Sequence, residues 1–177
     1  MKDRSWQKWE IAGLLVTLAA GNTLHFVYDW SGGSTIAAVF AAVNESTWEH
    51  MKLLAVPWLL WTVLQAAVLR NVSVLPGRAL GLLTGLAAIP LLFYGYTGAL
   101  GVSSMIVDIA IFQVAVLLGF LVSWLIQSHR KLTGRFWQIL AALVLLGVAA
   151  VFVWWTFQPP RLPVFIDPTT GLTGPGK

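Results

Sequence analysis

Asn44-Glu45-Ser46-Thr47-Trp48-Glu49-His50-Met51-Lys52 is followed directly by an uncharged run that extends from Leu53 to Leu69. An α-helix needs about 20 mainly apolar residues to cross the hydrocarbon core of a bilayer, so the sequence predicts a membrane-spanning helix over residues 46–69. The charged stretch then lies at the mouth of that helix. Charged side chains at this depth are costly and are usually retained for a function. The sequence therefore predicts the functional site at this stretch.

The composition of the whole chain is that of a membrane protein. Of its 177 residues, 58% are hydrophobic and 10% are charged, whereas a soluble domain carries roughly a quarter charged residues. The net charge is +4, but the basic residues are not clustered with exposed aromatic side chains, so we expect no nucleic-acid binding. The chain contains no Cys, which excludes disulfides, thiol catalysis and thiolate metal ligands.

Four further segments have the length and apolar character of membrane spans: residues 11–30, 79–100, 102–127 and 136–157. The predicted fold is therefore an all-α integral membrane protein, with five transmembrane helices in a bundle over residues 1–158. The apolar stretch 36–43 lies between the first two spans and is too short to cross, so we expect a short re-entrant or interfacial helix there. Residues 159–177 are rich in Pro and Gly, which predicts an external tail.

The basic residues predict the orientation of the bundle. Eight Lys and Arg residues precede the first span or belong to the second and fourth loops. Only three lie in the other loops and the tail. Because loops rich in Lys and Arg face the cytoplasm, we expect a cytoplasmic N-terminus and an external C-terminal tail, in a prokaryotic cytoplasmic membrane. The eight are Lys2, Arg4, Lys8, Arg70, Arg78, Arg130, Lys131 and Arg135, and the three are Lys52, Arg161 and Lys177.

Polar side chains within the predicted spans are concentrated at the outer ends. Asn22, His25 and Asp29 share one stripe of the first span, because successive residues of a helix are about 100° apart. Asp108 lies near the outer start of the fourth span. The inner halves are expected to be plain hydrocarbon apart from the loop cations. This distribution indicates one localised polar site on the outer side.

The second span supplies the other half of the predicted site. Glu45, Glu49 and Lys52 form a stripe at i, i+4 and i+7, with Ser46 and His50 beside it. Helices joined by a short connection are typically antiparallel neighbours, so the stripes of the first two spans can face each other. Their imidazoles and carboxylates would then line one outward-facing pocket.

This set of side chains suits a divalent metal, because imidazole and carboxylate ligands favour Zn, Fe or Mn. We predict a metal-dependent membrane enzyme, hydrolase-like, that acts on a lipid or lipid-linked substrate. Glu45 would act as general base, Ser46 would orient the water or the substrate, and Lys52 would support them. The predicted metal ligands are His25, Asp29, Glu49, His50 and Asp108.

Two other functions are compatible with the same cluster. A proton-coupled or ion transporter would use the carboxylates and histidines as a relay, although apolar inner halves offer no continuous polar path. A non-catalytic subunit of a larger membrane complex would use the cluster to hold two helices together. Partners are therefore expected to be the lipid bilayer, other membrane proteins or further copies of this chain.

Several of these residues also have plain structural interpretations. Asn44 is the expected N-cap of the second span, and Glu49 and Lys52 at i, i+3 can form an ordinary ion pair. The tail is expected to cover the pocket as a lid or to lie along the membrane interface. Trp side chains in the second span are expected to face lipid or the interface, namely Trp48, Trp58 and Trp61.

Three motifs carry a resemblance to a known family: His25-Phe26-x-x-Asp29-Trp30, Asn44-Glu45-Ser46-x-Trp48-Glu49-His50-x-Lys52, and Pro159-Pro160 through Phe165-x-Asp167-Pro168. They resemble the signature of a family of small multipass prokaryotic membrane proteins of unknown function, which implies a fold and no activity. More distantly, the chain is similar to the intramembrane metal-dependent hydrolases that include alkaline ceramidases and adiponectin-type receptors. Those proteins use a Ser, an Asp and three His within seven helices, whereas this chain offers two suitable His and five helices.

Overall fold

The computed structural model describes residues 5–129 and 132–175, and within them the chain is helical with no β-strand. Five helices are long and apolar enough to cross a membrane, which confirms the predicted all-α fold with five transmembrane helices. Shorter elements are α2 (Thr35–Phe40) and the 3₁₀ turns η1 (Val72–Val74) and η2 (Pro163–Phe165). The five long helices are α1 (Ser5–Trp30), α3 (Thr47–Leu69), α4 (Leu75–Leu100), α5 (Met105–His129) and α6 (Arg135–Phe157).

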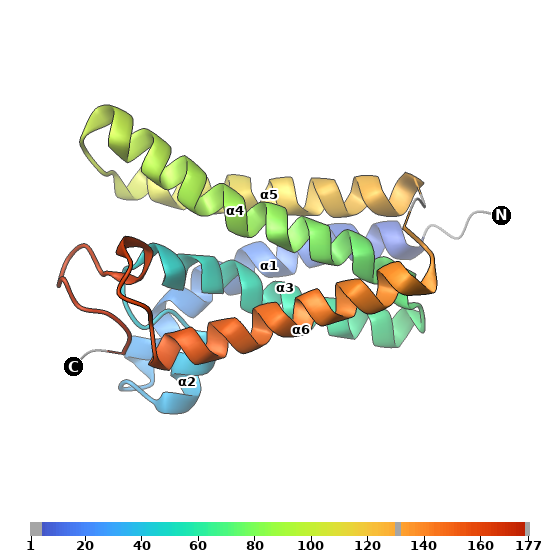
Figure 1. Cartoon of the computed structure of the whole chain (residues 1–177), viewed down its shortest axis with the longest axis horizontal. Helices are drawn as coiled ribbons and strands as arrows, with labels where there is room; N and C mark the ends of the chain where they lie inside the picture. The colour runs from blue at the N-terminus through green and yellow to red at the C-terminus, as the bar shows by residue number, and fades with distance from the viewer. Residues whose placement is uncertain (1–4, 130–131, 176–177) are drawn as a thin grey trace.

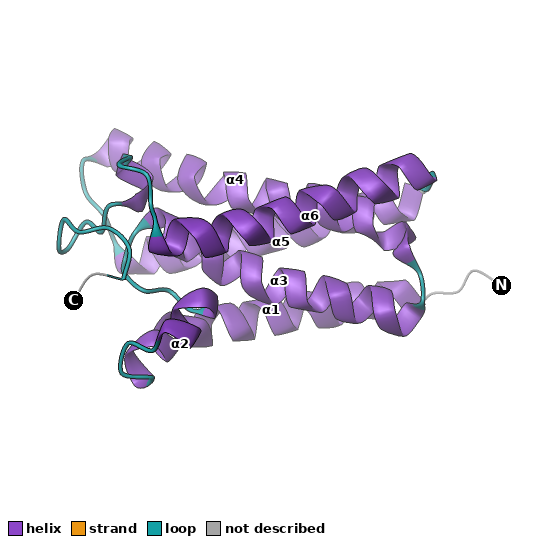
Figure 2. Ribbon diagram, turned by 60° about the horizontal axis from the view of Figure 1, so that its bottom comes forward, coloured by secondary structure: helices purple, strands orange, loops and turns teal. Residues whose placement is uncertain are grey.

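The long helices run along the long axis of an elongated bundle and alternate in direction (Figure 1). The loops gather at its two ends (Figure 2). One end carries the beginning of α1; the other carries α2, the beginning of α3 and the C-terminal tail (Figure 1). Five of the basic residues behind the predicted orientation lie outside the described residues: Lys2, Arg4, Arg130, Lys131 and Lys177.

Glycines allow α4 and α5 to pack closely. A Cβ on Gly119 would lie 2.8 Å from the carbonyl oxygen of Gly81, so no larger residue fits at this crossing. Small residues commonly serve this purpose between membrane helices. Trp58 of α3 lies against both glycines and is 0% exposed. The prediction that this Trp faces lipid is therefore wrong, because its ring fills the space that the glycines leave.

Trp48 is also buried, contrary to the prediction that it faces lipid. Its ring packs against Phe152 of α6 at a centroid distance of 4.3 Å and against Phe165 of the tail at 4.7 Å. Phe165 is itself buried. This aromatic cluster fastens the tail to the start of α3. Trp61 lies half-buried against α1, where its Nε1 donates a hydrogen bond to the carbonyl of Trp9.

The end of the bundle that carries the N-terminus contains a buried polar network, so the expectation of a plain hydrocarbon interior there is wrong. Arg78, expected to be a loop cation, is a fully buried residue of α4 whose Nε lies 3.4 Å from Oε1 of Glu10. Its Nε and Nη2 donate to Oε1 of Gln65 at 2.8 and 2.6 Å. Gln127 donates to Glu10 at 2.8 Å. The network ties α1, α3, α4 and α5 together.

Candidate functional site

The start of α3 is set by Ser46. Its hydroxyl accepts a hydrogen bond from the backbone N–H of Glu49, which makes it the N-cap of the helix. Asn44, the expected cap, forms the preceding turn instead, where its Oδ1 accepts from the N–H of Ser46 at 2.9 Å. Because the helix begins at Thr47, Glu45 belongs to the loop and its side chain can reach across to α1.

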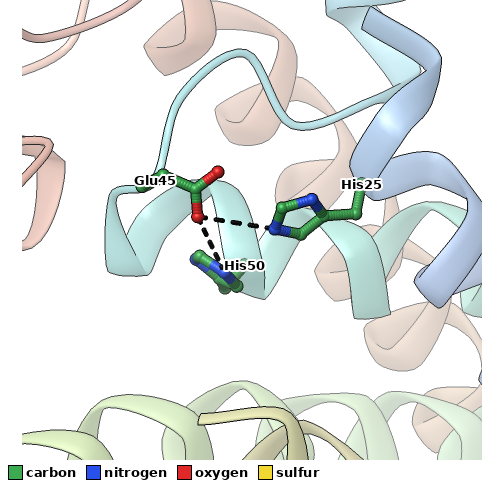
Figure 3. A group of neighbouring side chains, drawn as sticks. All are labelled: His25, Glu45 and His50. Atoms are coloured by element: carbon green, nitrogen blue, oxygen red, sulfur yellow. Dashed lines mark ion pairs between the residues drawn. The ribbon is translucent and has the colours of Figure 1, made fainter. Parts of the chain in front are cut away.

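His25, Glu45 and His50 come together at this end of the bundle (Figure 3). His25 lies on α1 and His50 on the first turn of α3, with the Glu45 carboxylate between them. Oε2 of Glu45 is 3.4 Å from Nε2 of His25 and 3.7 Å from Nε2 of His50. One ligand atom from each residue lies within 4.8 Å of the other two. The three side chains therefore converge on one small volume.

The tautomer of His50 follows from its surroundings. Nδ1 lies 2.9 Å from the carbonyl oxygen of Ser46, which can only accept a hydrogen bond, so Nδ1 carries a hydrogen. In the neutral imidazole the lone pair is then on Nε2, which faces the Glu45 carboxylate. A lone pair that faces an anion is stabilised when a proton, another cation or a hydrogen-bond donor such as water lies between them. Metal-binding histidines are oriented in this same way, by a hydrogen bond from the ring nitrogen that does not bind the metal.

The Glu45 carboxyl group is held in its ionised form. Its pKa is lowered from the ordinary value, chiefly by the hydrogen bond with His25, and this effect outweighs the opposing effect of burial. The three side chains are between 27% and 46% exposed. Ion pairs with this much exposure contribute little to stability, so the cluster is poorly explained as a device that holds the helices together.

Two of the three distances between ligand atoms are close to those of a metal site. Two ligand atoms that each lie about 2.0–2.1 Å from a tetrahedral metal are separated by about 3.3–3.4 Å. The two pairs that involve Glu45 are separated by 3.4 and 3.7 Å, so a small inward movement would complete the geometry. Two His and one Glu form a ligand set that is known from catalytic zinc sites, which leave the fourth position open.

Glu49 and Lys52 lie apart from this group, in a buried ion pair. Nζ of Lys52 is 2.5 Å from Oε2 of Glu49, and the two side chains are 0% and 2% exposed. Lys52 also donates to the carbonyl of Ala38 at 2.9 Å and to Oγ1 of Thr156 at 3.0 Å. Glu49 accepts a further hydrogen bond from the N–H of Val43. This is the ion pair that the structural interpretation of the two residues predicted.

The remaining predicted site residues line two cavities that flank the group. The apolar cavity, of about 220 Å³, is lined by Glu45, His50 and Asp108 among mainly apolar side chains of α4 and α5. The acidic cavity, of about 210 Å³, is lined by His25, Asp29, Glu45 and Asp167. Asp108 is held by Tyr96, whose hydroxyl donates to its Oδ1 at 2.5 Å. Asp29 and Asp108 are thus near the three-residue group but not part of it.

A family model covers nearly all of the chain. The model described as a family of unknown function, DUF6512, matches residues 1–174. The chain belongs to DUF6512. The predicted membership of a family of unknown function is thereby confirmed. Comparisons with curated proteins and with solved structures gave no match.

In this DUF6512 protein the tail lines both cavities, which agrees with the interpretation of the tail as a lid and not with a tail that lies along the membrane interface. Pro168 and Thr169 line the apolar cavity, whereas Thr170, Leu172 and Gly174 line the acidic one. Asn44 holds the tail in place by donating to the carbonyl of Gly174 at 2.9 Å. The Phe165-x-Asp167-Pro168 motif has no helical period, so the sequence did not predict which tail residues line which cavity.

Asp167 is the acidic residue that the tail brings to the DUF6512 site, and it is 4% exposed. Burial raises its pKa, but hydrogen bonds from Thr169 and Thr170 outweigh that effect, so the pKa is lowered overall. Its Oδ1 accepts from the N–H and the hydroxyl of Thr169 at 2.7 and 2.6 Å. An ionised carboxylate therefore closes the acidic cavity on the side of the tail.

Proposed function

We propose that this DUF6512 protein binds a divalent transition metal through His25, Glu45 and His50 and uses it to hydrolyse a lipid or lipid-linked substrate. The observation that carries the proposal is the convergence of these three side chains, with Nε2 of His50 facing the carboxylate and a cavity on either side. Zn, Fe and Mn are the metals that such nitrogen and oxygen ligands favour.

A metal held here would lower the pKa of a bound water toward about 7 and polarise a carbonyl group. In this proposal Glu45, first considered as a general base, is a ligand. Asp108 lines the apolar cavity with His50 and takes the proton that the attacking water loses. As the water oxygen bonds to the carbonyl carbon, the ester or amide bond breaks and Asp108 passes that proton to the leaving group. The second proton of the water stays with the carboxylic acid product.

The supporting residues position this machinery. Ser46 orients His50 through its carbonyl and starts α3 through its hydroxyl. Glu49 and Lys52 anchor the beginning of α3 to the segment that carries Ala38 and to α6. We place the site on the outer side of a cytoplasmic membrane. In support, Lys8, Arg70 and Arg135 lie toward the opposite end of the bundle, and basic loops face the cytoplasm.

Metal analysis of the purified, tag-free protein tests the proposal. After treatment with a chelator and incubation with Zn²⁺, Fe²⁺ or Mn²⁺, the wild-type protein should retain about one ion per chain. His50→Ala and His25→Ala should each lose it. His129→Ala is the matched control, because this exposed His lies at the end of α5, at the opposite end of the bundle, and its loss should change nothing. Equal metal content in wild type and His50→Ala would rule the proposed site out.

A transporter is the second candidate, and the buried network of Glu10, Gln65, Arg78 and Gln127 favours it. This network supplies polar side chains to the half of the bundle where the sequence suggested none. Intramembrane ionisable residues often belong to ion or proton pathways. A flux assay in liposomes tests this alternative. If Glu10→Gln abolishes a flux of metal or protons while metal binding at His25 and His50 stays intact, transport is favoured over hydrolysis.

A further inference from the structure

The two cavities beside the candidate metal group differ in chemistry and meet at one residue. Glu45 lines both of them, and consecutive tail residues cover both, with Pro168 and Thr169 over the apolar cavity and Thr170 over the acidic one. A single molecule that enters this end of the bundle can therefore occupy both cavities and pass the three-residue group between them.

The apolar cavity suits a hydrocarbon chain, because apolar side chains of two helices line it. These side chains are Ile89 and Phe93 of α4 and Ile111 and Phe112 of α5. Ile89, Ile111 and Phe112 are buried within the bundle. A chain that enters this cavity from lipid or detergent exchanges one apolar environment for another, because lipid tails are as apolar as a protein interior. The cavity therefore accepts the chain, and the preference among amphiphiles is set by the head group.

The acidic cavity selects against negative charge. Asp29, Glu45 and Asp167 line it, and among the described residues neither Lys nor Arg does. Asp29 makes no side-chain hydrogen bond to any residue in the described part of the chain, so its carboxylate is free to meet a ligand. With a divalent metal on two neutral histidines and Glu45, three carboxylates leave one net negative charge. An ammonium group neutralises that charge, whereas a phosphate monoester of charge about −1.5 to −2 increases it.

We infer that the substrate of this site is a single-chain amphiphile with an ammonium-bearing head group. The chain lies in the apolar cavity, the head lies in the acidic cavity, and the bond to be cleaved lies at Glu45, where the cavities meet. This inference rests on the proposed function for its cleavage step. The binding of the amphiphile itself requires only the two cavities.

Native mass spectrometry of the zinc-loaded protein in a neutral detergent tests the inference, with dodecylammonium and dodecyl phosphate as probes. We expect dodecylammonium to bind at least about tenfold more tightly than dodecyl phosphate. Equal binding of the two dodecyl probes would overturn the inference.

Variants separate the head from the chain. Asp29→Asn should reduce the preference for ammonium over phosphate. Phe93→Trp narrows the apolar cavity and should weaken dodecyl binding without changing the head-group preference. Leu91→Trp is its matched control, because Leu91 is on the same helix but 72% exposed. If Asp29→Asn leaves the head-group preference unchanged, the assignment of the head to the acidic cavity is wrong.

The metal content of each sample distinguishes the two proposals. Wild-type protein that binds zinc but shows no ammonium preference would refute the substrate class and leave the metal site standing. Wild-type protein that binds no zinc yet prefers dodecylammonium would refute the metal-dependent hydrolase and leave the amphiphile site standing.

Discussion

Lys52→Met should destabilise the bundle strongly, because it leaves a charge unpaired in the interior. The Lys52 ammonium lies 2.5 Å from Glu49 and donates hydrogen bonds to the carbonyl of Ala38 and the hydroxyl of Thr156. The side chains of the ion pair are 0% and 2% exposed. After the substitution, the N–H of Val43 is the one hydrogen-bond donor that Glu49 keeps within the described part of the chain. The whole beginning of α3 depends on this arrangement.

The expected loss in the free energy of unfolding is about 3–5 kcal/mol, which is the usual effect of removing one partner of a buried ion pair. Thr156→Val removes one hydrogen bond to the same amino group and the donation of the Thr156 hydroxyl to the carbonyl of Phe152, and it should cost only about 1–2 kcal/mol. In the double variant Glu49→Gln/Lys52→Met neither position carries a charge, and the Gln side chain can still accept from Val43. The double variant should therefore recover most of the loss.

Equilibrium unfolding in mixed micelles with a denaturing detergent, followed by tryptophan fluorescence, measures these differences. The ten Trp residues provide the signal. If Lys52→Met lies within about 1 kcal/mol of wild type, the buried pair is not the anchor that we describe. A double variant no more stable than Lys52→Met would show that lost packing, and not an unpaired carboxylate, is responsible.

Three further predictions concern packing and the tail. Trp48→Ala removes the ring that packs against Phe152 and Phe165; it should cost about 3–5 kcal/mol and, in limited proteolysis, expose the tail. Gly119→Ala should destabilise the bundle because its Cβ would meet the Gly81 carbonyl, whereas Gly147→Ala has open space and should be neutral or stabilising in the same unfolding assay. The Asp167 carboxyl has a pKa below its usual 3.8, so its contribution to tail docking is complete above about pH 3.8 and disappears as the pH falls through the lower pKa of the folded state. Pepsin should accordingly cleave the wild-type tail only at the acid end of a series from pH 2 to 5, and the tail of Asp167→Asn throughout it.

The long helices could be predicted because each membrane span is a continuous run of apolar residues in the sequence. Each apolar run long enough to cross a bilayer became a helix, and the helical period placed His25 on one stripe and His50 beside the stripe that could face it. The loop position of Glu45 depended on which residue capped α3. Asn44 and Ser46 are both good caps, so the sequence could not decide between them, and the structure places the cap at Ser46.

Burial inside the bundle could not be predicted in the same way. Lipid tails are as apolar as a protein core, so hydrophobicity does not separate a lipid-facing Trp from a buried one, and Trp58 was misjudged for that reason. Arg78 seemed to be a loop cation because its partners are remote in sequence. Glu10 is a residue of α1, and Gln127, which donates to Glu10, lies 117 positions further along the chain.

X-ray absorption spectroscopy of the zinc-loaded protein tests the central claim most directly. We expect nitrogen and oxygen ligands at about 2.0–2.1 Å from the zinc ion, together with scattering from two imidazole rings. His50→Ala should lose one of these rings, and His129→Ala should keep both. A spectrum with no imidazole scattering, or with two rings still present in His50→Ala, would contradict a metal site built from His25, Glu45 and His50.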